Sequence, residues 1–144
     1  MGHWRHNTGG VDLNRDWAYY RQPEVKQIAD YIVREAHKTN NQVVLGLDFH
    51  STWEDIFYSN SRNNQSVIAG FSDKWLKGIE ESIPGYTIKD EPSDMNRPVS
   101  KNWFFTQFKA EGLTFEIGDN TPRDLIRLKG QIAAQKMMEI LLNP

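Results

Sequence analysis

The sequence contains no cysteine, no long apolar segment and almost no net charge. The lack of cysteine excludes disulfide bonds and thiolate ligands for zinc. No apolar run approaches the length of about 18 residues that a membrane-spanning helix needs, and the mean hydropathy is −0.67. A net charge of −2 gives no sign of a basic surface for nucleic acid. We therefore expect neither a membrane nor a nucleic acid as a partner.

The remaining composition is that of an ordinary globular domain. With 144 residues, 38% of them hydrophobic, the chain is long enough to bury a core, and residues 1–144 are predicted to form one domain. The opening residues, Met1 to His6, are not followed by the apolar stretch of a signal peptide. The sequence does not indicate the cellular compartment, because a protein without disulfides tolerates either an oxidising or a reducing environment.

Apolar periodicity predicts helices that alternate with short strands. The helices are expected at 23–36, 66–81, 103–110 and 122–142, the strands at 43–49 and 113–117, and a long loop at 84–102 with a short extended piece at 86–88. Gly112 is expected to end the third helix, because glycine is preferred just past a helix end. The order predicts an α/β fold, a three-layer α/β/α sandwich with a mixed, mostly parallel sheet. Two strands are too few to cover the apolar faces of these helices. The sheet is therefore expected to be incomplete, because the N-terminal half of the fold is missing.

Three polar segments stand out from this pattern. One is the run 10–17, which contains Asp12, Asn14 and Arg15. The second is His50, at the end of an apolar strand, and the third is Glu116, a carboxylate inside another apolar strand. A lone histidine at a strand end is more often structural than functional, whereas an unpaired buried carboxylate is costly. Because ligands bind at the carboxyl ends of strands in open α/β sheets, these groups can share one cleft.

Together these segments resemble the zinc carboxypeptidases, the carboxypeptidase A-like metallopeptidases. The resemblance covers nearly the whole chain, including a tryptophan thirteen residues before the glutamate and a long closing helix. Its motifs are, in chain order, Trp4-Arg5, Gly10-Val11-Asp12-Leu13-Asn14-Arg15-Asp16-Trp17, His50-Ser51 and Thr114-Phe115-Glu116.

The resemblance implies hydrolysis of a peptide bond next to a free terminal carboxylate. It implies that His50 is a zinc ligand and that Glu116 is the general base. Arg5 would stabilise the oxyanion of the tetrahedral intermediate.

The substrate-binding and supporting roles come from the same resemblance. Asn14 and Arg15 would grip the terminal carboxylate, for which the planar fork of arginine is well suited. Ser51 would bind substrate, and Asp12 would orient a zinc-bound histidine.

One departure from the family pattern concerns the metal. The first two zinc ligands of the family come from a His-x-x-Glu motif upstream of the Trp-Arg pair, and this motif does not occur in the sequence. Since catalytic zinc normally has three protein ligands, we expect one Zn²⁺ ion only when an upstream segment supplies two of them. The chain is therefore expected to be the C-terminal part of a longer enzyme, to bind zinc weakly and to lack peptidase activity alone.

Two further positions bear on the substrate. The family has a mobile pocket tyrosine about nine residues before the tryptophan, where this chain has Asp94, and the nearest tyrosine, Tyr86, is too early. Two residues before the same tryptophan, at the floor of the family's specificity pocket, stands Lys101. It is either a solvated loop lysine, the more ordinary interpretation, or a cation that favours an acidic terminal residue of the substrate.

Two other functions remain open at this point. One is a zinc-dependent deacylase of the aspartoacylase or succinylglutamate desuccinylase type, which acts on acyl-amino acids and has similar Asp-Leu-Asn-Arg and strand-end histidine features. The other is a non-catalytic module that binds peptide C-termini through Asn14 and Arg15. A free sheet edge would in addition permit self-association.

Overall fold

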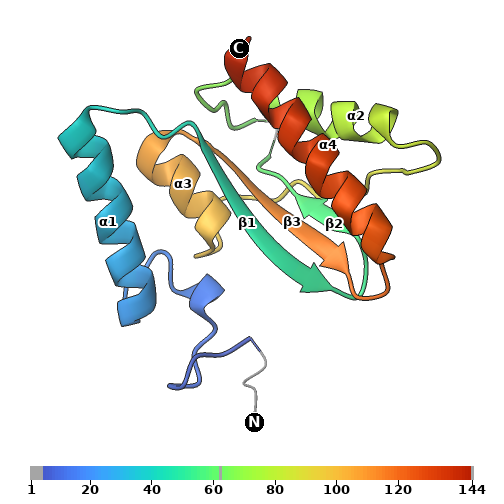
Figure 1. The fold of residues 1–144 in the computed structure, drawn as a ribbon. Coiled ribbons are helices and arrows are strands. Elements are labelled where there is room, and N and C mark those ends of the chain that lie inside the picture. The colour runs from blue at the N-terminus through green and yellow to red at the C-terminus, as the bar shows by residue number, and fades with distance from the viewer. Residues whose placement is uncertain (1–4, 62, 144) are drawn as a thin grey trace.

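The computed structural model describes residues 5–61 and 63–143 and shows a small sheet between two groups of helices (Figure 1). The elements follow one another as η1 (Leu13–Arg15), α1 (Pro23–Thr39), β1 (Leu45–Thr52), β2 (Ile56–Tyr58), α2 (Phe71–Ser82), α3 (Ser100–Phe108), β3 (Glu111–Gly118) and α4 (Arg123–Leu142). Trp4 and His3 lie outside the described residues. Within those residues, no helix is both long and apolar enough to cross a bilayer.

The sheet has three strands in the order β1-β3-β2. β1 and β3 run parallel over eight residue pairs, and β2 pairs antiparallel with the end of β3. The predicted α/β class with a mixed sheet is therefore confirmed. The sequence analysis missed β2, whose three residues are too few to show a period.

One face of the sheet lies against α3. Side chains of a strand alternate between the two faces, and on this face β1 and β3 begin with Gly46 and Gly112. A Cβ at Gly112 would lie 2.0 Å from the carbonyl oxygen of Lys101, and one at Gly46 would lie 2.1 Å from the ring of Phe104. The two glycines thus let α3 approach the backbone of the sheet. Gly112 therefore does not end a helix, as expected from the sequence, but belongs to β3.

The other face carries the hydrophobic core and is covered by α2 and α4. Phe115 of β3 stacks on Phe57 of β2 at 4.3 Å, and the indole of Trp75 in α2 meets both rings edge-on. The indole N–H of Trp75 donates to the carbonyl of Ala133, which ties α2 to α4. Figure 1 shows α2 beside α4, and α1 beside α3 on the other side. The predicted three layers are present.

Two helices differ from their predicted bounds for local reasons. The helix expected from residue 66 begins at Phe71, because Gly70 adopts a left-handed conformation in front of it. The helix expected from residue 103 begins at Ser100 and ends at Phe108, where Lys109 is left-handed. α1 begins at Pro23 as expected. The segment 86–88 is not a strand; the loop pairs instead at Asp90 and Ser93.

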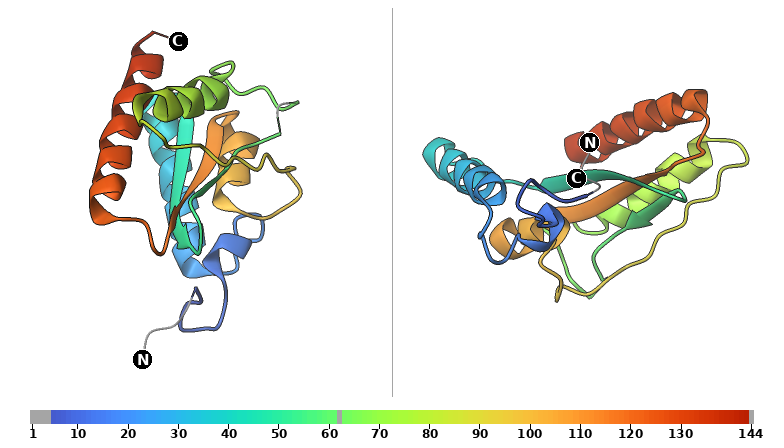
Figure 2. Two further views of the ribbon diagram at one scale, coloured as in Figure 1. Left: turned by 90° about the vertical axis from the view of Figure 1, so that its right-hand side faces the viewer. Right: turned by 90° about the horizontal axis from the view of Figure 1, so that it is seen from below.

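β1 forms one edge of the sheet, and Phe49 on this strand is 67% exposed. The N-terminal segment lies at the end of the sheet toward which β1 and β3 run (Figure 2). It is tied there by the backbone N–H of Trp17, which donates to the carbonyl of Pro98. This brings three distant parts of the chain to the carboxyl ends of the two parallel strands.

Candidate functional site

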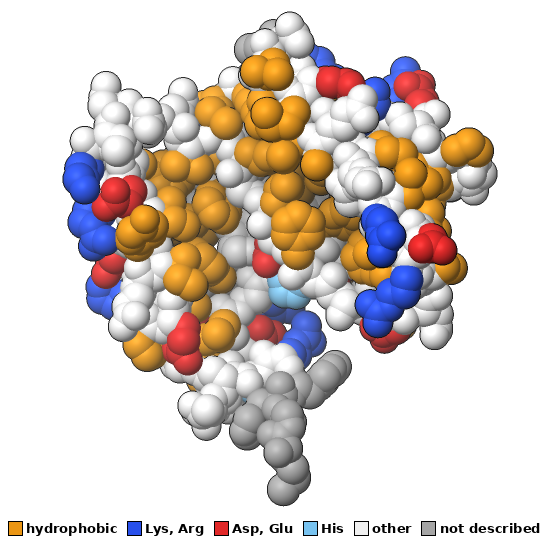
Figure 3. Space-filling model, in the orientation of Figure 1, with side chains coloured by type: hydrophobic (Ala, Val, Ile, Leu, Met, Phe, Trp, Pro, Cys, Tyr) orange, Lys and Arg blue, Asp and Glu red, His pale blue; other side chains and the backbone are white. Residues whose placement is uncertain are grey.

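A cavity of about 840 Å³ opens at the carboxyl ends of β1 and β3. All the residues singled out in the sequence for catalysis, binding or metal ligation line it: Arg5, Asp12, Asn14, Arg15, His50, Ser51, Lys101 and Glu116. In Figure 3 a histidine and charged side chains of both signs lie around a recess below a hydrophobic surface. The chain thus brings together groups that are more than 100 residues apart.

His50 and Glu116 lie directly opposite each other on neighbouring strands. The parallel register pairs His50 with Glu116, so both side chains point to the face that the cavity occupies. Burial raises the pKa of Glu116, an effect partly offset by the nearby imidazole of His50 and by Arg5. A carboxylate with a raised pKa next to an imidazole is the arrangement expected of a general base.

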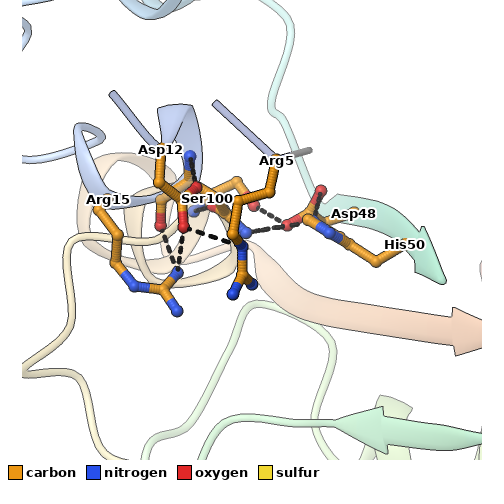
Figure 4. Close-up of polar contacts among 7 residues, drawn as sticks. Arg5, Asp12, Arg15, Asp48, His50 and Ser100 are labelled. Carbon is orange, nitrogen blue, oxygen red and sulfur yellow. Dashed lines mark hydrogen bonds and ion pairs between the residues drawn. The ribbon is translucent and has the colours of Figure 1, made fainter. Parts of the chain in front are cut away.

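The imidazole of His50 is held by Asp48, which the sequence analysis did not single out (Figure 4). The carboxylate Oδ1 of Asp48 lies 2.9 Å from Nε2 of His50, and this hydrogen bond raises the pKa of the histidine. Burial alone would raise the pKa of Asp48, but its hydrogen bonds with His50, Ser100 and Asn14 lower it. Nε2 of His50 also lies 3.1 Å from Nδ2 of Asn14, so both printed contacts of the ring are at this nitrogen.

Asp12 contacts the two arginines of the cavity wall. Its carboxylate lies 3.3 Å from Nε of Arg5 and 4.0 Å from Nη1 of Arg15, and it accepts a hydrogen bond from the backbone N–H of Asn14. The resemblance implied that Asp12 orients a zinc-bound histidine, and that role stays a prediction. In the described residues the carboxylate bonded to His50 is that of Asp48, while Asp12 lies against the two guanidinium groups.

Asn14 is anchored at both ends of its side-chain amide. Its Nδ2 donates to Oδ2 of Asp48 at 2.9 Å, and its Oδ1 accepts from the backbone N–H of Ser100 at 2.8 Å. The hydroxyl of Ser100 donates to the same Oδ2 of Asp48. The guanidinium of Arg15, in contrast, donates to the carbonyl of Asn14 at 2.8 Å and remains half-exposed.

Lys101 lies in α3 and is only 3% exposed, so the interpretation as a solvated loop lysine is wrong. Its ammonium group donates to the carbonyl of Ser59 and to the side-chain oxygens of Asn60 and Asn102. Burial lowers its pKa to about 8. Ser51 is exposed and lines the cavity.

Several cavity residues had no signal in the sequence analysis. Tyr58 enters the cavity from β2, while Arg97 comes from the loop before α3 and Trp53, 75% exposed, from the β1–β2 connection. Tyr86, the nearest candidate for the family's pocket tyrosine, packs against the core over the ammonium group of Lys129. Tyr58 could have been found only by recognising β2, because its position depends on the pairing of that strand with β3.

The donor set does not complete a metal site. Among residues 5–61 and 63–143, no group of three histidine or carboxylate side chains is arranged to hold a metal ion. His50 offers one imidazole nitrogen, whereas a catalytic zinc ion takes three protein ligands. The described part of the chain therefore does not by itself fit the zinc ion of the zinc carboxypeptidases.

No family model and no curated protein matches the sequence, but solved structures match the fold. A Shewanella denitrificans protein described as a carboxypeptidase A is 25% identical, with a TM-score of 0.66 over 94% of this chain and 41% of its own. A metallo-carboxypeptidase from Burkholderia cenocepacia is 17% identical, with a TM-score of 0.60 over 96% and 39%. One from Pseudomonas aeruginosa, in complex with (2-guanidinoethylmercapto)succinic acid, is 19% identical, with a TM-score of 0.57 over 95% and 40%.

These matches confirm the resemblance at the level of the fold. The chain has the α/β fold of carboxypeptidases and spans about two fifths of the length of the solved structures that it matches.

Proposed function

We propose that this chain is the C-terminal part of a zinc-dependent metallocarboxypeptidase, which hydrolyses the amide bond next to a free C-terminal carboxylate. The observation that carries the proposal is the register of the two parallel strands, which pairs His50 with Glu116 at the floor of one cavity. Two guanidinium groups, those of Arg5 and Arg15, line the same cavity. An amide hydrolase acting at a carboxylate terminus needs both a base and cationic anchors.

Each group has a role that its surroundings support. Glu116, whose pKa is raised by burial, takes the proton of the attacking water and passes it to the leaving amine. Arg5 stabilises the negative charge that develops on the carbonyl oxygen, and Arg15 binds the terminal carboxylate through its planar fork. Asp12 orients both arginines. Ser51, at the cavity rim, contacts the substrate chain.

The zinc ion of the family would need two further ligands besides His50. We expect them from a segment upstream of this chain that contains His-x-x-Glu, so the purified chain should bind Zn²⁺ weakly and hydrolyse no peptide. Metal analysis after dialysis, together with a peptidase assay, tests this. Stoichiometric zinc that survives dialysis, or sustained turnover, would contradict it. The coding sequence upstream of Met1 is the direct place to look for the motif.

Lys101 points to the substrate side chain that the site prefers. The ammonium group of Lys101 already donates to Ser59, Asn60 and Asn102, but these neutral partners do not cancel its positive charge, which favours an acidic residue at the substrate's C-terminus. In an enzyme with its metal site completed, peptides ending in Glu should be cleaved faster than those ending in Leu or Phe. Lys101→Met should remove this preference, and a wild-type preference for Leu or Phe would refute the assignment.

A module that binds peptide C-termini without turnover is the second candidate. It is favoured by the incomplete donor set for a metal within the described residues, whereas a general base such as Glu116 has no obvious use in it. An upstream coding sequence without His-x-x-Glu would favour this module. A deacylase would be distinguished by faster turnover of acylated amino acids than of short peptides in the metal-complete protein.

A further inference from the structure

We propose that Arg97 contacts the acidic side chain of the residue at the substrate's C-terminus, whereas Lys101 acts on that side chain through its charge alone. This inference rests on the proposed function and adds to it a residue that determines specificity. Arg97 lies in the loop before α3, and Lys101 lies in the first turn of that helix. Both residues line the cavity that holds His50 and Glu116.

The ammonium group of Lys101 already uses all of its N–H groups. An ammonium group carries three N–H donors. In Lys101 they are matched by three oxygen acceptors, at 3.1, 2.8 and 3.1 Å, which belong to the buried residues Ser59, Asn60 and Asn102. A substrate carboxylate would have to displace one of these acceptors and leave it buried without its donor, which is costly. Lys101 therefore offers a carboxylate its positive charge rather than a hydrogen bond.

Arg97 has the donors that Lys101 cannot offer. A guanidinium group carries five N–H donors in a planar fork that matches the two oxygens of a carboxylate. Arg97 is exposed, and within residues 5–61 and 63–143 its guanidinium group has no carboxylate at ion-pair distance. Burial lowers the pKa of Lys101 to about 8, and the positive charge of Arg97 acts in the same direction, so the two cations lie close enough to repel each other. A carboxylate bound by Arg97 would relieve this repulsion.

Asn102 holds the backbone of Arg97 beside the ammonium group of Lys101. Its Nδ2 donates to the carbonyl of Arg97 at 2.9 Å and to that of Asp94 at 3.3 Å, and its Oδ1 accepts from Lys101. The backbone N–H of Val99 donates to the same carbonyl of Arg97 at 2.9 Å. Two hydrogen bonds thus fix the backbone of Arg97 at the cavity wall, which limits the region that its guanidinium group can reach.

The α3 side of the cavity can therefore accept a second carboxylate of the substrate. Two carboxylates, those of Asp90 and Glu111, raise the pKa of Lys101 by their charge, but burial outweighs them and both accept from serine hydroxyls. Within the described residues neither of them forms an ion pair with Lys101 or Arg97. A substrate that ends in glutamate has two carboxylates. In the proposed function its terminal carboxylate binds to Arg15, and its side-chain carboxylate would bind to Arg97.

Modification of arginine by phenylglyoxal tests the assignment in the purified chain and needs neither metal nor activity. Peptide mapping by mass spectrometry after a short reaction gives the modification rate of each arginine separately. Saturating N-acetylglutamate, which has both carboxylates, should slow the modification of Arg97 by roughly fivefold or more, since occupancy of the site masks the group. N-acetylleucine, which has only the terminal carboxylate, should leave the rate of Arg97 within about twofold. Both ligands should slow the modification of Arg15.

Arg34 is the internal control in the same digest. Its side chain is exposed on α1 and does not line the cavity. Neither ligand should change its modification rate by more than about twofold, because it has no site to be masked in. Equal protection of Arg34 and Arg97 by N-acetylglutamate would show a general effect of the added acid and overturn the assignment.

Arg97→Gln and Arg123→Gln form a matched pair of variants. Each removes one exposed guanidinium group, but Arg123 lies at the start of α4 and does not line the cavity. Calorimetric titration of the wild type should show N-acetylglutamate bound about tenfold more tightly than N-acetylleucine, the effect of one charge-assisted hydrogen-bonded pair. Arg97→Gln should lose this preference, Arg97→Lys should retain part of it, and Arg123→Gln should keep it. An undiminished preference in Arg97→Gln, with its loss in Lys101→Met, would make Lys101 the contact and refute the inference.

The modification rates of Arg15 and Arg97 separate failure of this inference from failure of the proposed function. If both ligands protect Arg15 while Arg97 is protected by neither ligand, or by both alike, the role of Arg97 is wrong and the carboxylate anchor at Arg15 stands. If N-acetylglutamate protects Arg97 while neither ligand protects Arg15, the anchor of the proposed function is wrong and the role of Arg97 stands. Absence of protection at both arginines would refute both.

Discussion

The two faces of the β1–β3 pair are formed by alternate residues of the same two strands, yet one face packs in the hydrophobic core and the other carries the polar groups of the cavity. One face carries Leu113 and Phe115, which are almost fully buried in the core under α2 and α4. The other begins with glycines against α3 and ends in Asp48, His50 and Glu116 at the cavity. Apolar packing on one face of the sheet thus stabilises the fold. On the other face, partial burial and hydrogen bonding shift the pKa values of Asp48, His50 and Glu116.

The largest expected effect comes from removing a core ring on the apolar face. Phe115→Ala should lower the free energy of unfolding by about 3–5 kcal/mol, because the ring contacts Phe57, Trp75 and the ammonium group of Lys129. Glu116→Gln, one residue further on the other face, should change it by about 1 kcal/mol or less and in the stabilising direction, since it removes a carboxylate that burial disfavours. Chemical denaturation measures both. A loss in Glu116→Gln equal to that in Phe115→Ala would remove the contrast between the faces.

The next effect concerns the close approach of α3. Gly112→Ala places a methyl group against the carbonyl of Lys101 and should cost roughly 2 kcal/mol or more, as expected for overpacking against backbone. Gly130→Ala is the matched control, because nothing lies within 4 Å of the added methyl inside α4. It should stabilise the protein by roughly 0.5–1 kcal/mol, the usual gain in a helix. Thermal or chemical denaturation should therefore give opposite signs for the two variants.

Lys101 should make stability depend on alkaline pH. Its pKa falls from 10.5 to about 8 on folding, so its charged form is penalised in the folded state. This penalty applies in full below pH 8 and disappears as the pH rises to 10.5. Over this range the free energy of unfolding should rise by up to about 3 kcal/mol. Relative to Lys101→Met, the wild type should gain stability across this window. Parallel pH curves for the two proteins would show that Lys101 is not desolvated.

The smallest effect is on His50. The bond to Asp48 raises the pKa of His50, so the folded state gains stability below the unfolded value near 6.5 and loses it as the pH rises through the folded pKa. Asp48→Asn should bring the pKa of His50 down. NMR titration of the imidazole measures it directly, and an unchanged pKa would mean that Asp48 does not govern the ring.

The sequence predicted the helices with long apolar stripes and the two central strands, because those patterns depend on local spacing. It missed β2, whose short run Ile56–Tyr58 becomes a strand only through pairing with β3. It also placed Lys101 in a loop, since no local signal marks a lysine that a helix carries into a buried polar pocket. Both the strand β2 and the burial of Lys101 depend on contacts between residues far apart in the sequence, which local patterns do not reveal.

The same division applies to the site. Residue types and their order were enough to name eight side chains that line one cavity. The partners of these side chains were not predictable: Asp48 rather than Asp12 bonds to His50, and Asn14 joins η1 to the start of α3. A motif gives the identity of a side chain, whereas its hydrogen-bond partner depends on how three distant segments meet.

The contact between the amide of Asn14 and the backbone of Ser100 joins residues 86 positions apart. Closing so long a loop costs entropy that only later contacts repay. The bonds that Asn14 and Asp48 make with Ser100 can thus form only after the chain has been made at least as far as residue 100. During synthesis, a chain that has emerged only as far as β1 would lack these bonds, and its cavity would still lack the residues that α3 and β3 contribute.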